Sequence, residues 1–176
     1  MRHYWIVLIV LGAFILEGTL SEWILPESWQ SRVYVVPHLV LITVLYISIF
    51  TTRYLGLTYG LAFGFLQDVV YYGHSIGVYS FSYGLVAYAV GLAFRRVQLG
   101  VLTSLFVVLL GNLFYEMLIY GVYRFFLNVI RVDFQWAFMH QMLPSVLFNL
   151  LLGLALYLPA RKYLEPPENQ RDNEEK

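Results

Sequence analysis

The residues that could take part in chemistry are few and lie far apart in the sequence. The chain has no cysteine, and its four histidines fall in four different segments, as His3, His38, His74 and His140. Nucleophilic catalysis needs a nucleophile beside a base, and a metal site needs several ligands at a characteristic spacing. The sequence contains no His-Glu-x-x-His, no Gly-x-Ser-x-Gly and no phosphate-binding loop. We therefore expect a protein that is not an enzyme, with no catalytic residues, no bound metal and no cofactor.

Polar residues nevertheless recur at four-residue spacing in two apolar segments. The two sets are Asn112, Glu116 and Tyr120, and Gln141, Ser145 and Asn149. Residues four apart share one face of a helix, and polar side chains that bond across helices in a membrane contribute roughly 1 kcal/mol each. Two interpretations stay open. Asn112, Glu116 and Asn149 form a fixed polar core, or they line a path for an ion or a small substrate.

A third apolar segment combines glycines with an acidic residue. Gly56, Gly60 and Gly64 are spaced by four, and Asp68 lies one step further along the same face. Such glycines let two helix backbones approach closely, which is a main source of helix association in lipid. The following segment offers small residues at similar spacing, including Gly84 and Gly91. We predict that these two segments pack together, and that the glycines and Asp68 serve helix packing or partner binding.

Two further carboxylates in apolar segments, besides Glu116, need an explanation, because a charged group at mid-membrane costs about 2.5 to 3.5 kcal/mol. Asp68 is either a buried anchor or an interfacial residue. As an anchor, its expected donors are the backbone N–H groups of residues 73–77 and the Ser75 hydroxyl, with His74 as a possible charged partner. Glu17 lies near the end of the first apolar segment, where we expect it to be exposed to headgroup water.

The elements that must position these residues follow from the composition. Of the 176 residues, 60% are hydrophobic and 12% are charged, whereas soluble domains are nearer one half and one quarter. A soluble fold of this composition would expose large apolar patches, but in a bilayer those side chains face a suitable solvent. The formal net charge is zero, which argues against a nucleic-acid partner. We therefore predict an integral membrane protein in contact with membrane lipid.

Six stretches are long enough to cross about 30 Å of hydrocarbon, which takes roughly 20 residues. They are residues 4–20, 35–52, 55–72, 78–94, 101–123 and 138–158. The predicted fold is an all-α bundle of about six transmembrane helices over residues 1–164, with the first span uncleaved. Residues 165–176 contain no apolar side chain and are predicted to form a disordered polar cytoplasmic tail.

Basic residues near the helix ends indicate the orientation, because cytoplasmic loops are enriched in Lys and Arg. With the N-terminus inside, six basic residues fall on the cytoplasmic side and three fall outside. The inner set is Arg2, Arg53, Arg95, Arg96, Arg161 and Lys162, and the outer set is Arg32, Arg124 and Arg131. Both termini are therefore predicted to be cytoplasmic, with residues 21–34 and 124–137 outside.

The stretch from Pro37 to Arg96 resembles a known family. Its glycine-rich helix Gly56-Leu-Thr-Tyr-Gly-Leu-Ala-Phe-Gly64 ends in Phe-Leu-Gln-Asp68, and Gly73, Ser75 and Gly77 follow before Tyr83-Gly-Leu-Val-Ala-Tyr88. This pattern is similar to that of MreD, the rod shape-determining membrane protein.

The resemblance implies a multi-pass protein of the bacterial cytoplasmic membrane. MreD-like proteins are non-catalytic scaffolds of the elongation machinery for lateral peptidoglycan synthesis. Their implied partners are an MreC-like protein and also MreB, RodA and a class B penicillin-binding transpeptidase. Such proteins are also similar to the substrate-binding subunits of energy-coupling-factor vitamin transporters, so a small-molecule-binding subunit is the alternative. A cavity lined by Asn112, Glu116, Asn149 and Tyr120 would favour transport, and a packed core with apolar outer grooves would favour a scaffold.

Overall fold

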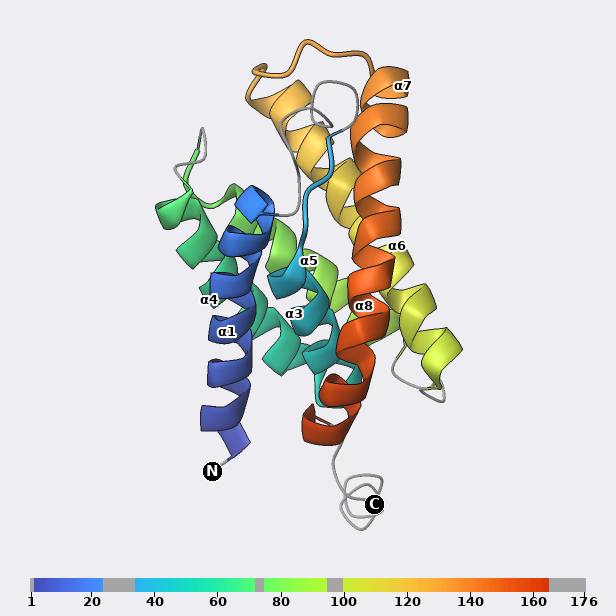
Figure 1. Ribbon diagram of the computed structural model, residues 1–176. Helices are drawn as coiled ribbons and strands as arrows, with labels where there is room; N and C mark the ends of the chain where they lie inside the picture. The colour runs from blue at the N-terminus through green and yellow to red at the C-terminus, as the bar shows by residue number, and fades with distance from the viewer. Residues whose placement is uncertain (1, 24–33, 72–74, 95–99, 165–176) are drawn as a thin grey trace.

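The computed structural model describes residues 2–23, 34–71, 75–94 and 100–164, and all regular structure within these ranges is helical (Figure 1). The prediction of an all-helical fold is confirmed for this part of the chain. The predicted tail at residues 165–176 lies outside the described residues. The elements are α1 (Arg2–Trp23), α3 (Leu39–Phe50), α4 (Arg53–Val70), α5 (Val78–Ala93), α6 (Val101–Gly121), η1 (Val122–Phe126), α7 (Phe134–Ala137), η2 (Phe138–Met142) and α8 (Leu143–Leu164).

Two of these helices are long and apolar enough to cross a membrane. The first is α6 with its π-helical extension η1, over Val101–Phe126, and the second runs through α7, η2 and α8 over Phe134–Leu164. Fewer than half of the residues in their most apolar stretches are buried inside the protein. The second of these helices is longer than the predicted span of 138–158, because it starts before residue 138 and ends after residue 158.

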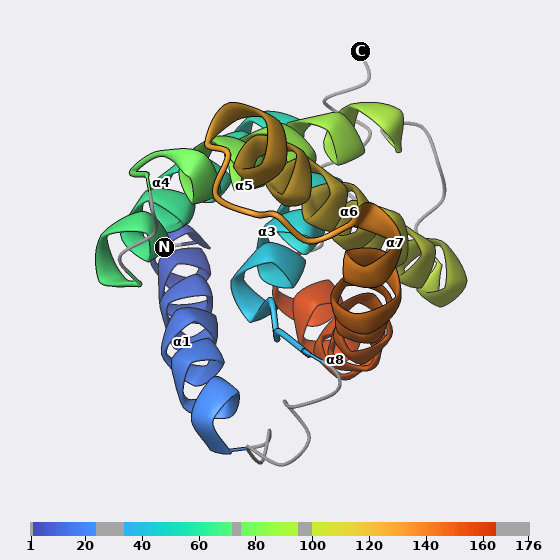
Figure 2. The same cartoon turned by 90° about the horizontal axis from the view of Figure 1, so that it is seen from above.

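Helix α3 lies at the centre of the bundle, with α1, α4, α5, α6 and α8 around it (Figure 2). Eleven of its twelve residues are buried. At 1.5 Å per residue it is only about 18 Å long. The predicted helix over residues 35–52 is wrong at its start, because residues 34–38 are not helical and lead into Leu39 as a separate segment. Pro37 explains the difference, since proline disfavours helical geometry in the residue before it.

The chain passes back and forth along the bundle, so the start of α1 and the end of α8 lie at the same end of the molecule (Figure 1). The short connection between α3 and α4 lies at this end too. The connection between η1 and α7 lies at the opposite end, where Asn128 adopts a left-handed backbone conformation with φ of 52°.

Candidate functional site

Helices α4 and α5 are in backbone contact along the glycine face. A Cβ atom built on Gly60 would lie 2.9 Å from the carbonyl carbon of Tyr83, and one on Gly64 would lie 2.6 Å from the Cα of Ser80. Both distances are too short for real atoms, and the neighbouring atoms belong to backbone that cannot rotate away. A Cβ atom built on Gly84 of α5 would instead lie 2.8 Å from the end of the Leu61 side chain.

Gly56 and Gly91 bring a third helix into this contact. A Cβ on Gly56 would lie 2.6 Å from the Cβ of Ser48 on α3, and a Cβ on Gly91 would meet the Ser48 hydroxyl and the Cβ of Arg53. The Ser48 hydroxyl donates a hydrogen bond to the Ala87 carbonyl at 2.5 Å. The five glycines singled out in the sequence thus lie inside the α3–α4–α5 unit rather than on an outer face.

Asp68 lies at the end of α4 and is 2% exposed. Its carboxylate accepts hydrogen bonds from the backbone N–H groups of Tyr79 (3.1 Å) and Ser80 (3.0 Å). These groups belong to the first turn of α5, where helical N–H groups lack an intrahelical partner and a negative charge is favourable. The donors differ from those expected in the 73–77 turn and at Ser75, because α5 begins only at Val78; His74 lies outside the described residues.

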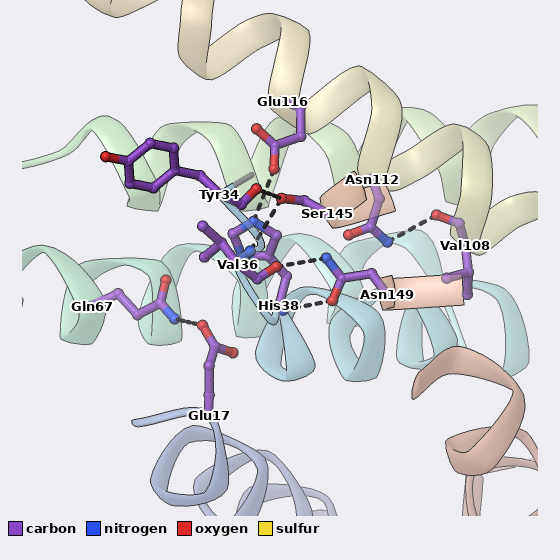
Figure 3. Close-up of polar contacts among 10 residues, drawn as sticks. All are labelled: Glu17, Tyr34, Val36, His38, Gln67, Val108, Asn112, Glu116, Ser145 and Asn149. Carbon is purple, nitrogen blue, oxygen red and sulfur yellow. Dashed lines mark hydrogen bonds and ion pairs between the residues drawn. The ribbon is translucent and has the colours of Figure 1, made fainter. Parts of the chain in front are cut away.

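Glu17 makes an equivalent contact that the sequence did not reveal. The expectation that Glu17 is exposed to headgroup water is wrong. Glu17 is only 7% exposed, and both of its carboxylate oxygens accept hydrogen bonds. One oxygen accepts from the Val40 backbone N–H at 2.8 Å, in the first turn of α3, and the other accepts from the Gln67 side chain at 2.6 Å. Glu17 therefore joins α1 to α3 and α4, and its contact with Gln67 on α4 is drawn in Figure 3.

The segment 34–38 runs beside the last helix, whose polar stripe supplies hydrogen bonds to its backbone. Asn149 accepts from the His38 backbone N–H at 2.8 Å and donates to the Val36 carbonyl at 3.0 Å. Ser145 accepts from the Val36 N–H at 3.1 Å. These contacts satisfy backbone groups that no helix or sheet satisfies (Figure 3). The role of Ser145 and Asn149 is thus to hold an irregular segment.

Glu116 and Asn112 on α6 both face the interior of the bundle, but they contact different segments of the chain. Glu116 pairs with the His38 ring at 3.2 Å, and both side chains are less than a tenth exposed. Asn112 donates to the Val108 carbonyl in its own helix at 2.9 Å. Tyr120, one step further along α6, instead donates to the Val132 carbonyl at 2.9 Å and so contacts the connection to α7. The predicted stripe on α6 therefore divides between two places.

This network can fix helix positions, but its geometry offers little to catalysis. Glu17 and Asp68 each hold backbone N–H groups, and Glu116 is paired with His38. Among the described residues, no three His, Cys, Asp or Glu side chains come close enough to share a metal ion. A cavity of about 170 Å³ lies beside the network, lined in part by Glu17, His38 and Gln67.

A large apolar hollow lies on the outside of the bundle. It has a volume of about 660 Å³ and is lined by Phe94, Leu102, Thr103, Leu105, Phe106, Leu109 and Leu150. Most of these residues belong to α6, with Phe94 at the end of α5 and Leu150 on α8. We call this hollow the α6 groove. Leu102 is 84% exposed and Phe106 is 54% exposed, so the groove is open to the surroundings.

Comparison with known proteins decides the family. A family model described as rod shape-determining protein MreD matches residues 2–166. The chain belongs to the MreD family. The resemblance found over residues 37–96 is thus confirmed and extends over nearly the whole chain.

A curated relative agrees with this assignment. The chain is similar to the rod shape-determining protein MreD of Bacillus subtilis (strain 168), with 22% identity over 164 residues, covering 93% of this chain and 94% of the relative. No solved structure matches significantly.

Proposed function

We propose that this MreD family member is a non-catalytic membrane scaffold of the bacterial machinery that maintains rod shape through lateral peptidoglycan synthesis. Family membership over nearly the whole chain carries this proposal. Its partner in the membrane is an MreC-like protein with a single span, and through it MreB, RodA and a class B penicillin-binding transpeptidase. The chain lies in the cytoplasmic membrane as one six-helix domain, residues 1–164, with both termini and the tail 165–176 in the cytoplasm.

The dimensions of the central segment support its placement across the membrane. The central crossing combines about 18 Å of α3 with residues 34–38, which add roughly 16 Å when extended. Together they match about 30 Å of hydrocarbon. Irregular backbone at membrane depth is tolerated only where protein surrounds it, and here Ser145 and Asn149 supply the missing hydrogen bonds.

The burial and pairing of the polar side chains inside the bundle support a scaffold rather than a vitamin-binding subunit. Asn149 and Asn112 are fully buried, and Glu116 is paired within the protein. The cavity beside the network, about 170 Å³, is smaller than the roughly 300 to 1,000 Å³ typical of small-molecule sites. The large hollow is the apolar α6 groove on the outside, the arrangement that favours binding of another membrane protein.

The α6 groove is our proposed docking site for the transmembrane helix of the MreC-like partner. It is lined by apolar side chains and lies largely on one of the two helices long enough to cross a membrane. A single apolar helix could place its side chains between those of Leu102 and Phe106. The packing glycines, from Gly56 to Gly91, lie within the bundle and are not needed for this contact.

Co-purification with a co-expressed MreC-like protein tests the proposal. We expect the pair to be recovered together, and Leu102→Trp with Phe106→Ala to reduce recovery of the partner several-fold because the shape of the groove changes. Leu151→Trp, at an exposed site on α8 outside the groove lining, is the matched control and should leave recovery unchanged. Equal loss in both variants would refute the groove assignment. Recovery of a tightly bound vitamin-like ligand without any protein partner would refute the scaffold function.

A further inference from the structure

A second hollow, with a different character, lies where α3 turns into α4. Its volume is about 280 Å³, and polar side chains contribute much of its lining, including Ser48, Thr51, Thr52, Arg53 and Tyr54. The α3–α4 connection, which these residues form or flank, lies at the same end of the bundle as the start of α1 and the end of α8 (Figure 1). A water molecule occupies about 30 Å³ of liquid, so the hollow has room for a group of several heavy atoms.

The Arg53 guanidinium lies against two tyrosine rings beside this hollow. Its guanidinium carbon lies 4.9 Å from the ring centre of Tyr54 and 5.6 Å from that of Tyr88, and it donates a hydrogen bond to the Tyr54 hydroxyl at 3.0 Å. Gly91 lets α5 approach so closely that a Cβ there would lie 2.8 Å from the Cβ of Arg53. The two rings therefore position the guanidinium, and the close approach of α5 positions the Cα and Cβ of Arg53 at the hollow.

No carboxylate in the part of the chain that the structure describes forms an ion pair with the Arg53 guanidinium. One N–H of its five is used on Tyr54, which leaves a fork of donors free for a planar or tetrahedral anion. The Thr52 hydroxyl accepts from the Leu55 backbone N–H at 3.3 Å, and its own proton stays available for another acceptor.

We propose that this hollow is a binding site for a phosphate group, held by the Arg53 guanidinium and the Thr52 hydroxyl. Arginine is well suited to phosphate because its fork can donate two parallel hydrogen bonds. The positive partial charge at the start of α4 adds to the attraction. An anionic phospholipid headgroup at the membrane face, or a free phosphate ion, would supply the ligand. The inference goes beyond the proposed scaffold function and does not depend on the protein partner.

Binding of lipids to the purified full-length chain in neutral detergent tests the site, with native mass spectrometry as the measurement. The probes are phosphatidylglycerol, which carries an anionic phosphate, and diacylglycerol, which has the same chains without phosphate. We expect phosphatidylglycerol to bind more tightly than diacylglycerol, and Arg53→Gln to weaken its binding about fivefold or more. Arg53→Lys keeps the charge but loses the fork, so it should give an intermediate affinity.

Lys162→Gln is the matched control, because Lys162 is a cation at the same end of the molecule that also lies against a tyrosine ring, 5.6 Å from the centre of Tyr163. It should leave phosphatidylglycerol affinity within about twofold. A further experiment with inorganic phosphate distinguishes the two ligands. If millimolar phosphate occupies the site and prevents lipid binding, the ligand is the free ion. If phosphatidylglycerol still binds in the presence of phosphate, the ligand is the lipid headgroup. Equal binding of both lipids, unchanged binding by Arg53→Gln, or an equal loss in Lys162→Gln would overturn the proposal. A normal unfolding temperature of Arg53→Gln in detergent alone confirms that the variant is folded.

Discussion

Asp68 makes two charge-assisted hydrogen bonds to the start of α5, so its removal leaves two buried N–H groups without an acceptor. We expect Asp68→Ala to reduce stability by about 1 to 3 kcal/mol. Asp68→Asn keeps one acceptor oxygen and should be milder. Thermal unfolding of the purified protein in detergent measures this, together with rescue of rod shape in a deletion strain.

The control for Asp68 is Asp133→Ala. Asp133 precedes α7 and makes no side-chain capping bond, so its loss should change the unfolding temperature little. Full rescue of rod shape by Asp68→Ala at wild-type abundance would leave Asp68 without the structural role assigned to it.

The environment of Glu17 could not be predicted from the residues around it in the sequence. An acidic residue near the end of an apolar helix has the same appearance in sequence whether it reaches headgroup water or a neighbouring helix. The only hint was Gln67, a second polar residue in an apolar segment that also needed a partner. The structure brings the two side chains within 2.6 Å of each other, although they are 50 residues apart.

A double-mutant cycle measures the contribution of this contact. Glu17→Ala should lower the unfolding temperature more than Gln67→Ala, because Glu17 also holds the Val40 N–H. The two changes together should cost less than their sum, with a coupling of roughly 1 kcal/mol. Thr19→Ala, an exposed position on the same helix, is the control. Additive effects of Glu17→Ala and Gln67→Ala would show that the side chains do not interact.

At the scale of elements, the contact between α4 and α5 has no space for a side chain. We expect Gly60→Leu and Gly64→Leu to reduce the yield of folded protein severely, because overpacking of a tight contact typically costs 1 to 3 kcal/mol or more. Gly12→Leu on α1 is the matched control, since no atom lies within 4 Å of its Cβ position. Size-exclusion profiles in detergent and unfolding temperatures are the measurements. Normal values for the two α4 variants would contradict the packing described here.

The sequence predicted which segments are helical better than where they begin. Hydrophobic length alone located six helices, and glycine spacing indicated which two would touch. The 34–38 segment could not be predicted, because it is apolar and continuous with α3 in sequence. Its conformation depends on Ser145 and Asn149, more than 100 residues away. The donors to Asp68 were missed for a related reason, since the start of α5 is set by Gly77 in a left-handed conformation with φ of 102°.

At the scale of the whole molecule, the arrangement of the helix ends makes the membrane orientation testable. The start of α1, the α3–α4 connection and the end of α8 share one end of the bundle, and the η1–α7 connection lies at the other (Figure 1). The distribution of Arg and Lys predicts that the first end is cytoplasmic. Any single site near either end therefore reports on the whole bundle.

Cysteine labelling can decide the orientation cleanly, because the chain has no cysteine of its own. Val129→Cys places a thiol in the η1–α7 connection at a residue that is 42% exposed, and Tyr163→Cys places one near the end of α8 at a residue that is 53% exposed. In intact cells, a membrane-impermeant maleimide added from outside should label position 129 and not position 163. After the membrane is opened, both positions should react, which shows that the second thiol is accessible. Labelling of position 163 alone in intact cells would reverse the orientation, and would place the phosphate site at Arg53 on the outer face.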